Sequence, residues 1–123
     1  MSLLRCKRGF TLIEMIAILV ILGVLASIAV PKYYDITREA QNRAALQAVT
    51  EGKARLSIQY ARLFLENASP PGTTSLVDAV GTNTNIGDYT LNFSSVDTLT
   101  IKINAAGRPG IEGTNSAFWL LPK

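Results

Sequence analysis

The sequence predicts an α+β protein in which a long N-terminal helix packs, by its C-terminal half, on a small antiparallel β-sheet. Three observations lead to this fold class. Residues 10–30 form an apolar block, and apolar residues at helical spacing continue from residue 32 to about residue 66. Apolar and polar residues then alternate strictly in two segments near the C-terminus. A length of 123 residues suggests one domain.

The apolar block, residues 10–30, is long enough to cross a membrane. As a helix it would measure about 31 Å, against a hydrocarbon core of ~30 Å. Arg5, Lys7 and Arg8 precede it, so the positive-inside rule places the N-terminus in the cytoplasm. A cleaved secretory signal peptide is the alternative, because residues 26–29 offer small side chains for cleavage.

Glu14 is the one charge inside this block. A carboxylate in a membrane helix costs about 2.5–3.5 kcal/mol on insertion scales, and such groups usually have a partner. Glu14 could reach the headgroups from its place near the helix end. The interpretation that we favour is that Glu14 meets a positive charge delivered by another chain.

Residues 7–14 read KRGFTLIE, and this segment resembles the processing site of type IV prepilins and type II secretion pseudopilins. The resemblance implies that a membrane-embedded aspartyl peptidase cuts between Gly9 and Phe10 and then methylates the new amine of Phe10. Glycine lets an extended backbone approach a protease closely. Lys7 and Arg8 would hold the cleavage site at the cytoplasmic surface.

The same resemblance implies roles for three residues of the apolar helix. Glu14 is expected to pair with the N-terminal amine of a neighbouring subunit, which would fix the axial step of a filament. Gly23 and Pro31 stand where many pilins carry helix-disrupting residues. Pro31 should kink or end the helix, because it lacks an N–H and clashes with the preceding turn. Residues 23–31 could melt locally in a filament or remain a kinked, continuous helix.

Pattern and resemblance together predict the domain organisation. Residues 1–9 are a cleaved leader, residues 10–31 the transmembrane and assembly helix, and residues 32–123 a globular pilin domain. Within that domain we expect a helix to about residue 66, a loop over 67–88 with a short helical turn at 76–80, and a sheet over 89–121. The predicted strands are 89–93, 99–104 and 117–121, with a loop at 105–113. The apolar stripe expected to face the sheet comprises Leu46, Val49, Leu56, Tyr60 and Leu63.

Composition argues against several classes of site. The chain has no histidine, and Cys6 is its only cysteine, so no disulfide can form within one chain. The oxygen ligands near the C-terminus are scattered and fit no calcium-loop spacing. They are Asp88, Asp97, Glu112 and Asn115. We therefore expect no cofactor, no metal and no catalytic residue. The net charge of +3 arises before the apolar block, so no basic face for nucleic acid is expected.

The expected function is that of a structural subunit of a type IV pilus. Its precursor would wait in the inner membrane and polymerise through its N-terminal helix into an extracellular filament. The resemblance implies a prepilin peptidase and methyltransferase, an assembly platform and motor ATPases as partners. A periplasmic type II secretion pseudopilin is the alternative, since those proteins commonly lack a disulfide. A small secreted binding protein and a membrane-anchored carboxylate enzyme are rivals of other classes.

Overall fold

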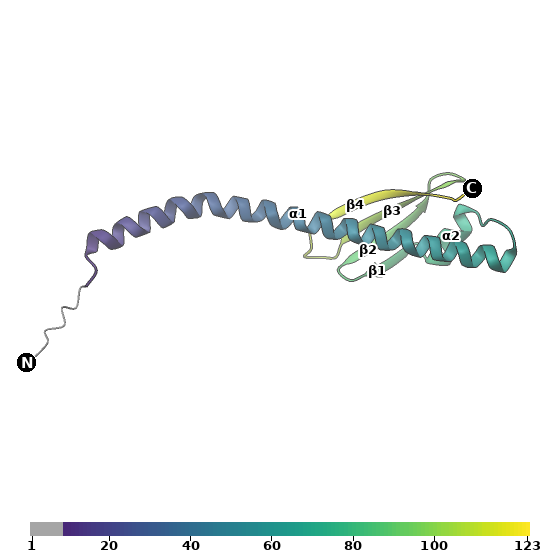
Figure 1. Ribbon diagram of the computed structural model, residues 1–123, viewed down its shortest axis with the longest axis horizontal. Helices are drawn as coiled ribbons and strands as arrows, with labels where there is room; N and C mark the ends of the chain where they lie inside the picture. Colours follow the sequence, from purple (N-terminus) through teal and green to yellow (C-terminus); the bar gives the residue numbers. More distant parts are fainter. Residues whose placement is uncertain (1–8) are drawn as a thin grey trace, which may run out of the picture. The chain divides into compact units, whose positions relative to one another are not determined.

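A computed structural model describes residues 9–123 of the chain. Contacts within the chain divide it into two units, residues 1–36 and residues 37–123, of which the first is described from residue 9. Helix α1, Leu12–Asn67, contributes to both units (Figure 1). The boundary between the units falls after Ile36, five residues beyond the end that was expected for the assembly helix.

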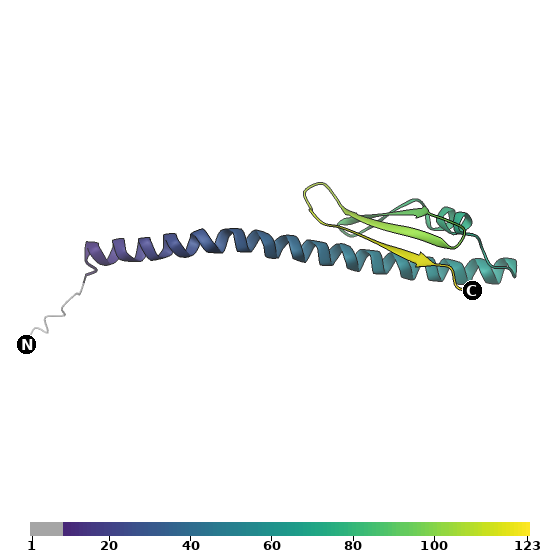
Figure 2. The same cartoon turned by 90° about the horizontal axis from the view of Figure 1, so that it is seen from above.

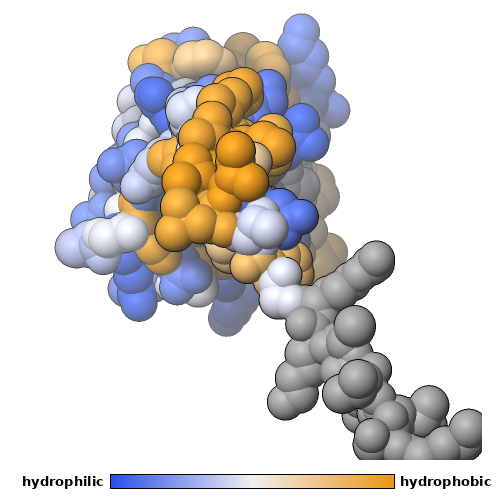
Figure 3. Space-filling view, turned by 90° about the vertical axis from the view of Figure 1, so that its left-hand side faces the viewer, coloured by the Kyte–Doolittle hydropathy of each residue, from blue (hydrophilic) through white to orange (hydrophobic). Residues whose placement is uncertain are grey.

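The first unit has no buried side chain among its described residues. Every residue from 9 to 36 is exposed, and almost all of this unit is the N-terminal part of α1. Apolar side chains gather over this helix at the front of the space-filling view (Figure 3). Its order therefore comes from the backbone hydrogen bonds of the helix and not from a core.

The second unit combines the rest of α1 with a short helix and one sheet. Helix α2 spans Thr73–Val80. The strands are β1 Asn83–Ile86, β2 Tyr89–Ser95, β3 Thr100–Gly107 and β4 Thr114–Leu120. They form one antiparallel sheet in the order β1-β2-β3-β4, and α1 covers one face of it (Figures 1 and 2). The predicted α+β class, a long helix with a small antiparallel sheet, is confirmed.

The core of the second unit lies between α1 and the sheet. Its fully buried large side chains come from both layers: Phe93, Leu56, Leu76, Leu91, Ile101, Ile103 and Val49. The close approach of the two layers depends on Gly52, which faces the sheet. A β-carbon at Gly52 would lie 2.9 Å from Leu91 Cδ1 and 3.2 Å from Ile103 Cγ2. A larger residue there would push the helix and the sheet apart.

The helix stripe that faces the sheet differs from the predicted one at Leu46. Val49 and Leu56 are buried, and Tyr60 and Leu63 pack against the core. Leu46 is 48% exposed, so its assignment to the stripe was wrong. The other buried positions of the stripe belong to small residues: Ala45, Ala48 and Gly52. Small residues contribute little to a pattern of apolar side chains, so this pattern favours the larger Leu46. Leu46 points about 100° round the helix axis from the buried Ala45.

The segment predicted as a loop, residues 67–88, contains two elements of its own. Helix α2 buries Leu76 and Val77, which confirms and extends the short helical turn expected at 76–80. Strand β1 was not predicted, and the sheet has four strands where three were expected. Strand β1, NTNI, lies at the edge of the sheet and buries none of its residues completely. Its sequence is mainly polar and therefore lacks the alternation that predicts a strand. Strand β3 also continues to Gly107, so the loop expected from residue 105 begins later.

Two contacts fix the sheet to α1 near the start of the second unit. The Tyr89 hydroxyl of β2 donates a hydrogen bond to the carbonyl oxygen of Gln41 at 2.8 Å. Gly113, which directly precedes β4, lies against the same carbonyl: a β-carbon there would be 2.8 Å from Gln41 O. Gly113 also has a φ of 142°, a conformation that favours glycine. These contacts are called the Gln41 clamp below.

Candidate functional site

A reciprocal pair of hydrogen bonds joins Thr11 and Glu14 at the start of α1. The Thr11 backbone N–H donates to Glu14 Oε2 at 3.0 Å. The Glu14 backbone N–H donates to Thr11 Oγ1 at 3.4 Å. This arrangement is a capping box, in which the N-cap threonine and the glutamate three residues later satisfy backbone donors at the helix start.

The capping box gives Glu14 a local role that the pilin motif does not suggest. It places a carboxylate beside the unpaired N–H groups and positive dipole end of α1, where negative charge is stabilising. Thr11 is a residue of the candidate site, as the N-cap of α1, that the sequence reasoning missed. The Thr-x-x-Glu signature ahead of an apolar run was the signal that could have identified it.

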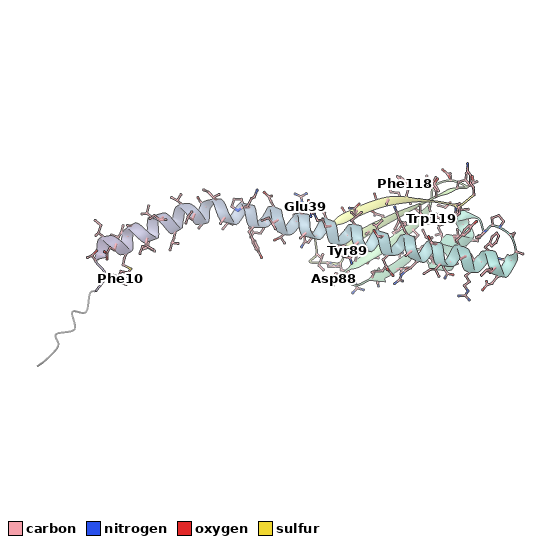
Figure 4. The ribbon with its side chains drawn as sticks, viewed as in Figure 1. Phe10, Glu39, Asp88, Tyr89, Phe118 and Trp119 are labelled. Carbon is pink, nitrogen blue, oxygen red and sulfur yellow. The ribbon has the colours of Figure 1, made fainter. Side chains whose placement is uncertain are left out.

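Gly9 and Phe10 precede Thr11, the N-cap residue of α1, and both are exposed. Phe10 is 76% exposed, and its side chain stands at the helix start in Figure 4. A β-carbon at Gly9 would meet no atom within 4 Å, so both sides of the bond between the two residues are open. The basic residues predicted to flank this bond, Lys7 and Arg8, lie outside the described residues.

The apolar surface that follows Glu14 is continuous and uncovered. Between residues 10 and 30 the large apolar side chains are 43% exposed (Met15) to 78% exposed (Leu12). By length and composition α1 could cross a membrane, a test that a signal sequence near the N-terminus would also pass. The structure therefore presents a long hydrophobic helix that nothing in the described chain buries.

Gly23 and Pro31 do not interrupt this helix. Helix α1 continues through both residues, which agrees with the continuous-helix alternative for the single chain; local melting in a filament stays a prediction. Pro31 has no N–H to donate to the Ser27 carbonyl, but the ladder bonds of the flanking turns remain. Glycine at position 23 weakens a helix by only ~1 kcal/mol relative to alanine. One missing bond and one weak residue are therefore tolerated within a helix of 56 residues.

A second exposed apolar surface lies on α1 within the second unit. Ala54, Ile58, Ala61 and Leu65 are exposed and recur along the helix at spacings of three and four. Ile58 is 67% exposed and Leu65 is 81% exposed. We call these four residues the outer stripe. Ion pairs within the helix flank it: Arg55 Nε lies 3.2 Å from Glu51 Oε1, and Arg62 Nε lies 2.9 Å from Glu66 Oε1.

A groove of about 560 Å³ lies between α1 and the turn that joins β1 to β2. Its lining is mainly apolar, and Glu51 and Asp88 supply its only charges. Glu51 already pairs with Arg55. Among residues 9–123, no group of three histidine, cysteine, aspartate or glutamate side chains could hold a metal ion. The groove presents no nucleophile beside a base, so the exposed helix is the better candidate for the functional site.

Comparison with known proteins points to the same part of the chain. Residues 4–30 match the family model of the prokaryotic N-terminal methylation motif. A fimbrial protein of Pseudomonas aeruginosa is 35% identical over 72 residues, which are 57% of this chain and 47% of that protein. A fimbrial protein of Neisseria meningitidis is 35% identical over 69 residues, covering 56% of this chain and 38% of its own length.

The type IV major pilin protein PilE1 of Neisseria gonorrhoeae is 35% identical over 71 residues, which are 56% of this chain and 33% of that pilin. The chain thus spans less than half the length of these relatives. No solved structure gave a significant match. The resemblance to the type IV pilin family, inferred from residues 7–14, is confirmed.

Proposed function

We propose that this chain, which carries the methylation motif of the type IV pilin family, is a structural subunit of a type IV pilus. The observation that carries the proposal is the exposed apolar segment over residues 10–30, which the described chain leaves uncovered. Such a surface is unfavourable in water, so it must be covered by lipid or by other chains. A precursor in the membrane and a filament of packed helices supply these two environments in turn. The role is structural, and we assign no enzymatic activity.

Maturation would begin with cleavage between Gly9 and Phe10, followed by N-methylation of Phe10. The open position of both residues ahead of the helix supports this step, because a protease needs accessible, non-helical backbone. Cleavage removes Lys7 and Arg8 and creates an ammonium group at the start of an apolar helix. The capping box stays on the mature side of the cut.

Glu14 would then pair with the amine of Phe10 from a neighbouring subunit. An ionised carboxylate can accept about four hydrogen bonds, so the bond from Thr11 leaves room for an ammonium. A pair of buried charges contributes little net stability but strongly penalises mismatched partners. The pair would therefore set the height at which each subunit enters the filament.

Two apolar surfaces of α1 would be buried on assembly: residues 10–30 and the outer stripe. Burial of both surfaces would make the filament stable without a covalent link between subunits. Residues 23–31 remain our candidate for a segment that melts in the filament, since Gly23 and Pro31 make this part of the helix its weakest.

The expected partners are other copies of the chain, a prepilin peptidase and methyltransferase, an inner-membrane assembly platform and motor ATPases. The precursor would lie in the inner membrane with its N-terminus in the cytoplasm, and the assembled subunit would be extracellular. A periplasmic type II secretion pseudopilin is the second candidate. The observation that favours it is the absence of cysteine from residues 9–123, which leaves the domain without a disulfide.

The first test is the mass of the N-terminal peptide of the protein recovered from cells that contain a prepilin peptidase. We expect a peptide that begins at N-methylated Phe10. A peptide beginning near Ser27 would contradict the proposal, because the assembly helix would have been removed with a signal peptide. Fibres sheared from the surface of intact cells would then separate a pilus from a periplasmic pseudopilus.

The second test addresses assembly. Glu14→Ala should be cleaved normally but should fail to enter filaments, because its helix cannot pair with the incoming amine. Glu39→Ala is the matched control: it also removes an exposed α1 glutamate, one whose carboxylate lies 3.0 Å from Arg43 Nε of the same helix. Normal incorporation of Glu14→Ala would contradict the proposed pairing.

A further inference from the structure

Three consecutive residues, Lys32, Tyr33 and Tyr34, follow the apolar helix with one intervening residue, Pro31. All three are exposed, and each tyrosine side chain is 70% exposed. They belong to the first unit and continue α1 without a break. Together with the apolar residues before them they extend one exposed apolar surface, and large surfaces of this kind mark contacts with membranes or proteins.

The position of these residues along the helix corresponds to a membrane surface. The part of α1 from residue 12 to residue 30 is about 28 Å long, close to a hydrocarbon core of ~30 Å. With Leu12 at the inner face of the hydrocarbon, residues 32–34 reach the headgroups of the opposite leaflet. Asp35, Arg38 and Glu39 follow, so charged side chains become frequent just beyond this level.

The chemistry of the three side chains suits that level. Tyrosine has an apolar ring and a polar hydroxyl, and it is enriched where a membrane span meets water. Lysine buries its aliphatic stem and extends its ammonium group toward phosphate. Phospholipid headgroups offer phosphate oxygens to both kinds of donor.

The arrangement of the residues around the helix distinguishes lipid from a protein partner. Successive helical residues are about 100° apart, so Lys32, Tyr33 and Tyr34 leave the helix in three different directions. Side chains that meet one protein partner recur every three or four residues on one face. Lipid surrounds a single helix on all sides, so a belt of adjacent residues fits lipid better.

We propose that Lys32, Tyr33 and Tyr34 form a membrane-interface anchor that contacts phospholipid headgroups and sets the height of the precursor before assembly. This inference rests on the proposed function in one respect: the apolar helix must span a membrane. It adds a role for a segment that the methylation motif does not include, since the motif match ends at residue 30.

The experiment measures the depth of the helix in a bilayer. The full-length precursor, in a Cys6→Ser background, is reconstituted in vesicles of phosphatidylethanolamine and phosphatidylglycerol. A nitroxide is attached to a single new cysteine, either Leu22→Cys or Val30→Cys. Collision rates with oxygen and with a water-soluble nickel chelate then report depth. In the chain with native tyrosines, both labels should collide often with oxygen and rarely with the nickel chelate.

The anchor is tested by adding Tyr33→Ser and Tyr34→Ser together. We expect nickel collisions at label 30 to rise by about twofold or more, because the segment loses the rings that hold it at the interface. Tyrosine-to-tryptophan changes at both positions should keep the original rate. The matched control is Val96→Ser, which removes an exposed apolar side chain of the second unit and should leave both collision rates unchanged.

Two results would overturn the anchor, and they differ in cause. In the first, label 22 is protected from nickel, but Tyr33→Ser with Tyr34→Ser leaves the nickel collision rate of label 30 unchanged. The helix then spans the bilayer, and the anchor alone is wrong. If label 22 collides with nickel as freely as a label in water, the helix does not span the bilayer, and the proposed membrane precursor fails with it.

Discussion

The two units of the chain treat apolar side chains in opposite ways. Residues 9–36 expose every side chain, although this is the most hydrophobic part of the sequence. In the second unit, Leu56, Leu91 and Ile103 are completely buried between α1 and the sheet. One unit is thus stabilised by its own packing, whereas the described chain leaves the apolar surface of the other uncovered. Substitutions should therefore affect one unit without the other.

Phe93→Ala should produce the largest effect, and only in the second unit. Phe93 is 2% exposed and lies in the centre of the core. Its removal should lower the free energy of unfolding of the domain by about 3–5 kcal/mol. Urea denaturation of the full chain in detergent, followed by Trp119 fluorescence, measures this loss. Membrane insertion should be unchanged, and a joint loss of insertion and domain stability would break the comparison.

Val20→Arg should produce the opposite result. Val20 is 60% exposed in the apolar helix. An arginine at the centre of a membrane helix costs about 2.5–3.5 kcal/mol on insertion scales. That cost corresponds to a loss of about 100-fold in the insertion equilibrium. The carbonate-resistant membrane fraction measures insertion, with Val20→Leu as the control. The urea midpoint of the domain should not move; a clear shift would mean that the two units are coupled.

Two glycines sharpen the comparison, because substitution by alanine should lower stability at one position and raise it at the other. Gly52→Ala forces a methyl group against Leu91 and should destabilise the domain by about 1–3 kcal/mol. Gly23→Ala meets no atom within 4 Å and should stabilise the apolar helix by up to about 1 kcal/mol. Urea denaturation tests the first variant, and helix content by circular dichroism tests the second. Destabilisation by Gly23→Ala would indicate a contact that the isolated chain does not show.

Ala68→Gly should give the smallest effect and a gain in stability. Ala68 directly follows α1 and has a φ of 52°, a left-handed conformation that glycine adopts more easily than alanine. We expect the domain to gain about 0.5–1 kcal/mol, measured as a higher urea midpoint. Ala61→Gly, at an exposed position inside the same helix, is the control and should lower the midpoint. A loss in both variants would show that the helix end gains nothing from glycine.

The fold could be predicted where one physical signal dominated. The apolar helix is long, and strands β2 and β3 alternate between a buried and a polar face. Strand β1 could not be found in this way, because it is an edge strand with no fully buried residue. The buried small residues Ala45, Ala48 and Gly52 were also missed. Their role is to let α1 and the sheet approach closely, which a pattern of apolar side chains does not reveal.

The motif names candidate site residues, whose roles stay a prediction, but it does not give their local structure. Gly9, Phe10 and Glu14 follow from the motif, which requires no knowledge of the fold. The hydrogen bonds between Thr11 and Glu14 depend on where the helix begins. Helix boundaries are the least certain part of a sequence prediction, so the capping role of Thr11 became clear only from the structure.

The Gln41 clamp has a mechanical consequence. If the helix is the part by which a subunit is held in a filament, a pulling force enters the domain through α1 near Gln41. The first attachments that it meets there are Tyr89 on β2 and Gly113 beside β4. Two strands that are not neighbours in the sheet thus receive the load together, and β3 bonds to both of them. Tension would be distributed over the sheet instead of peeling it from the helix one strand at a time.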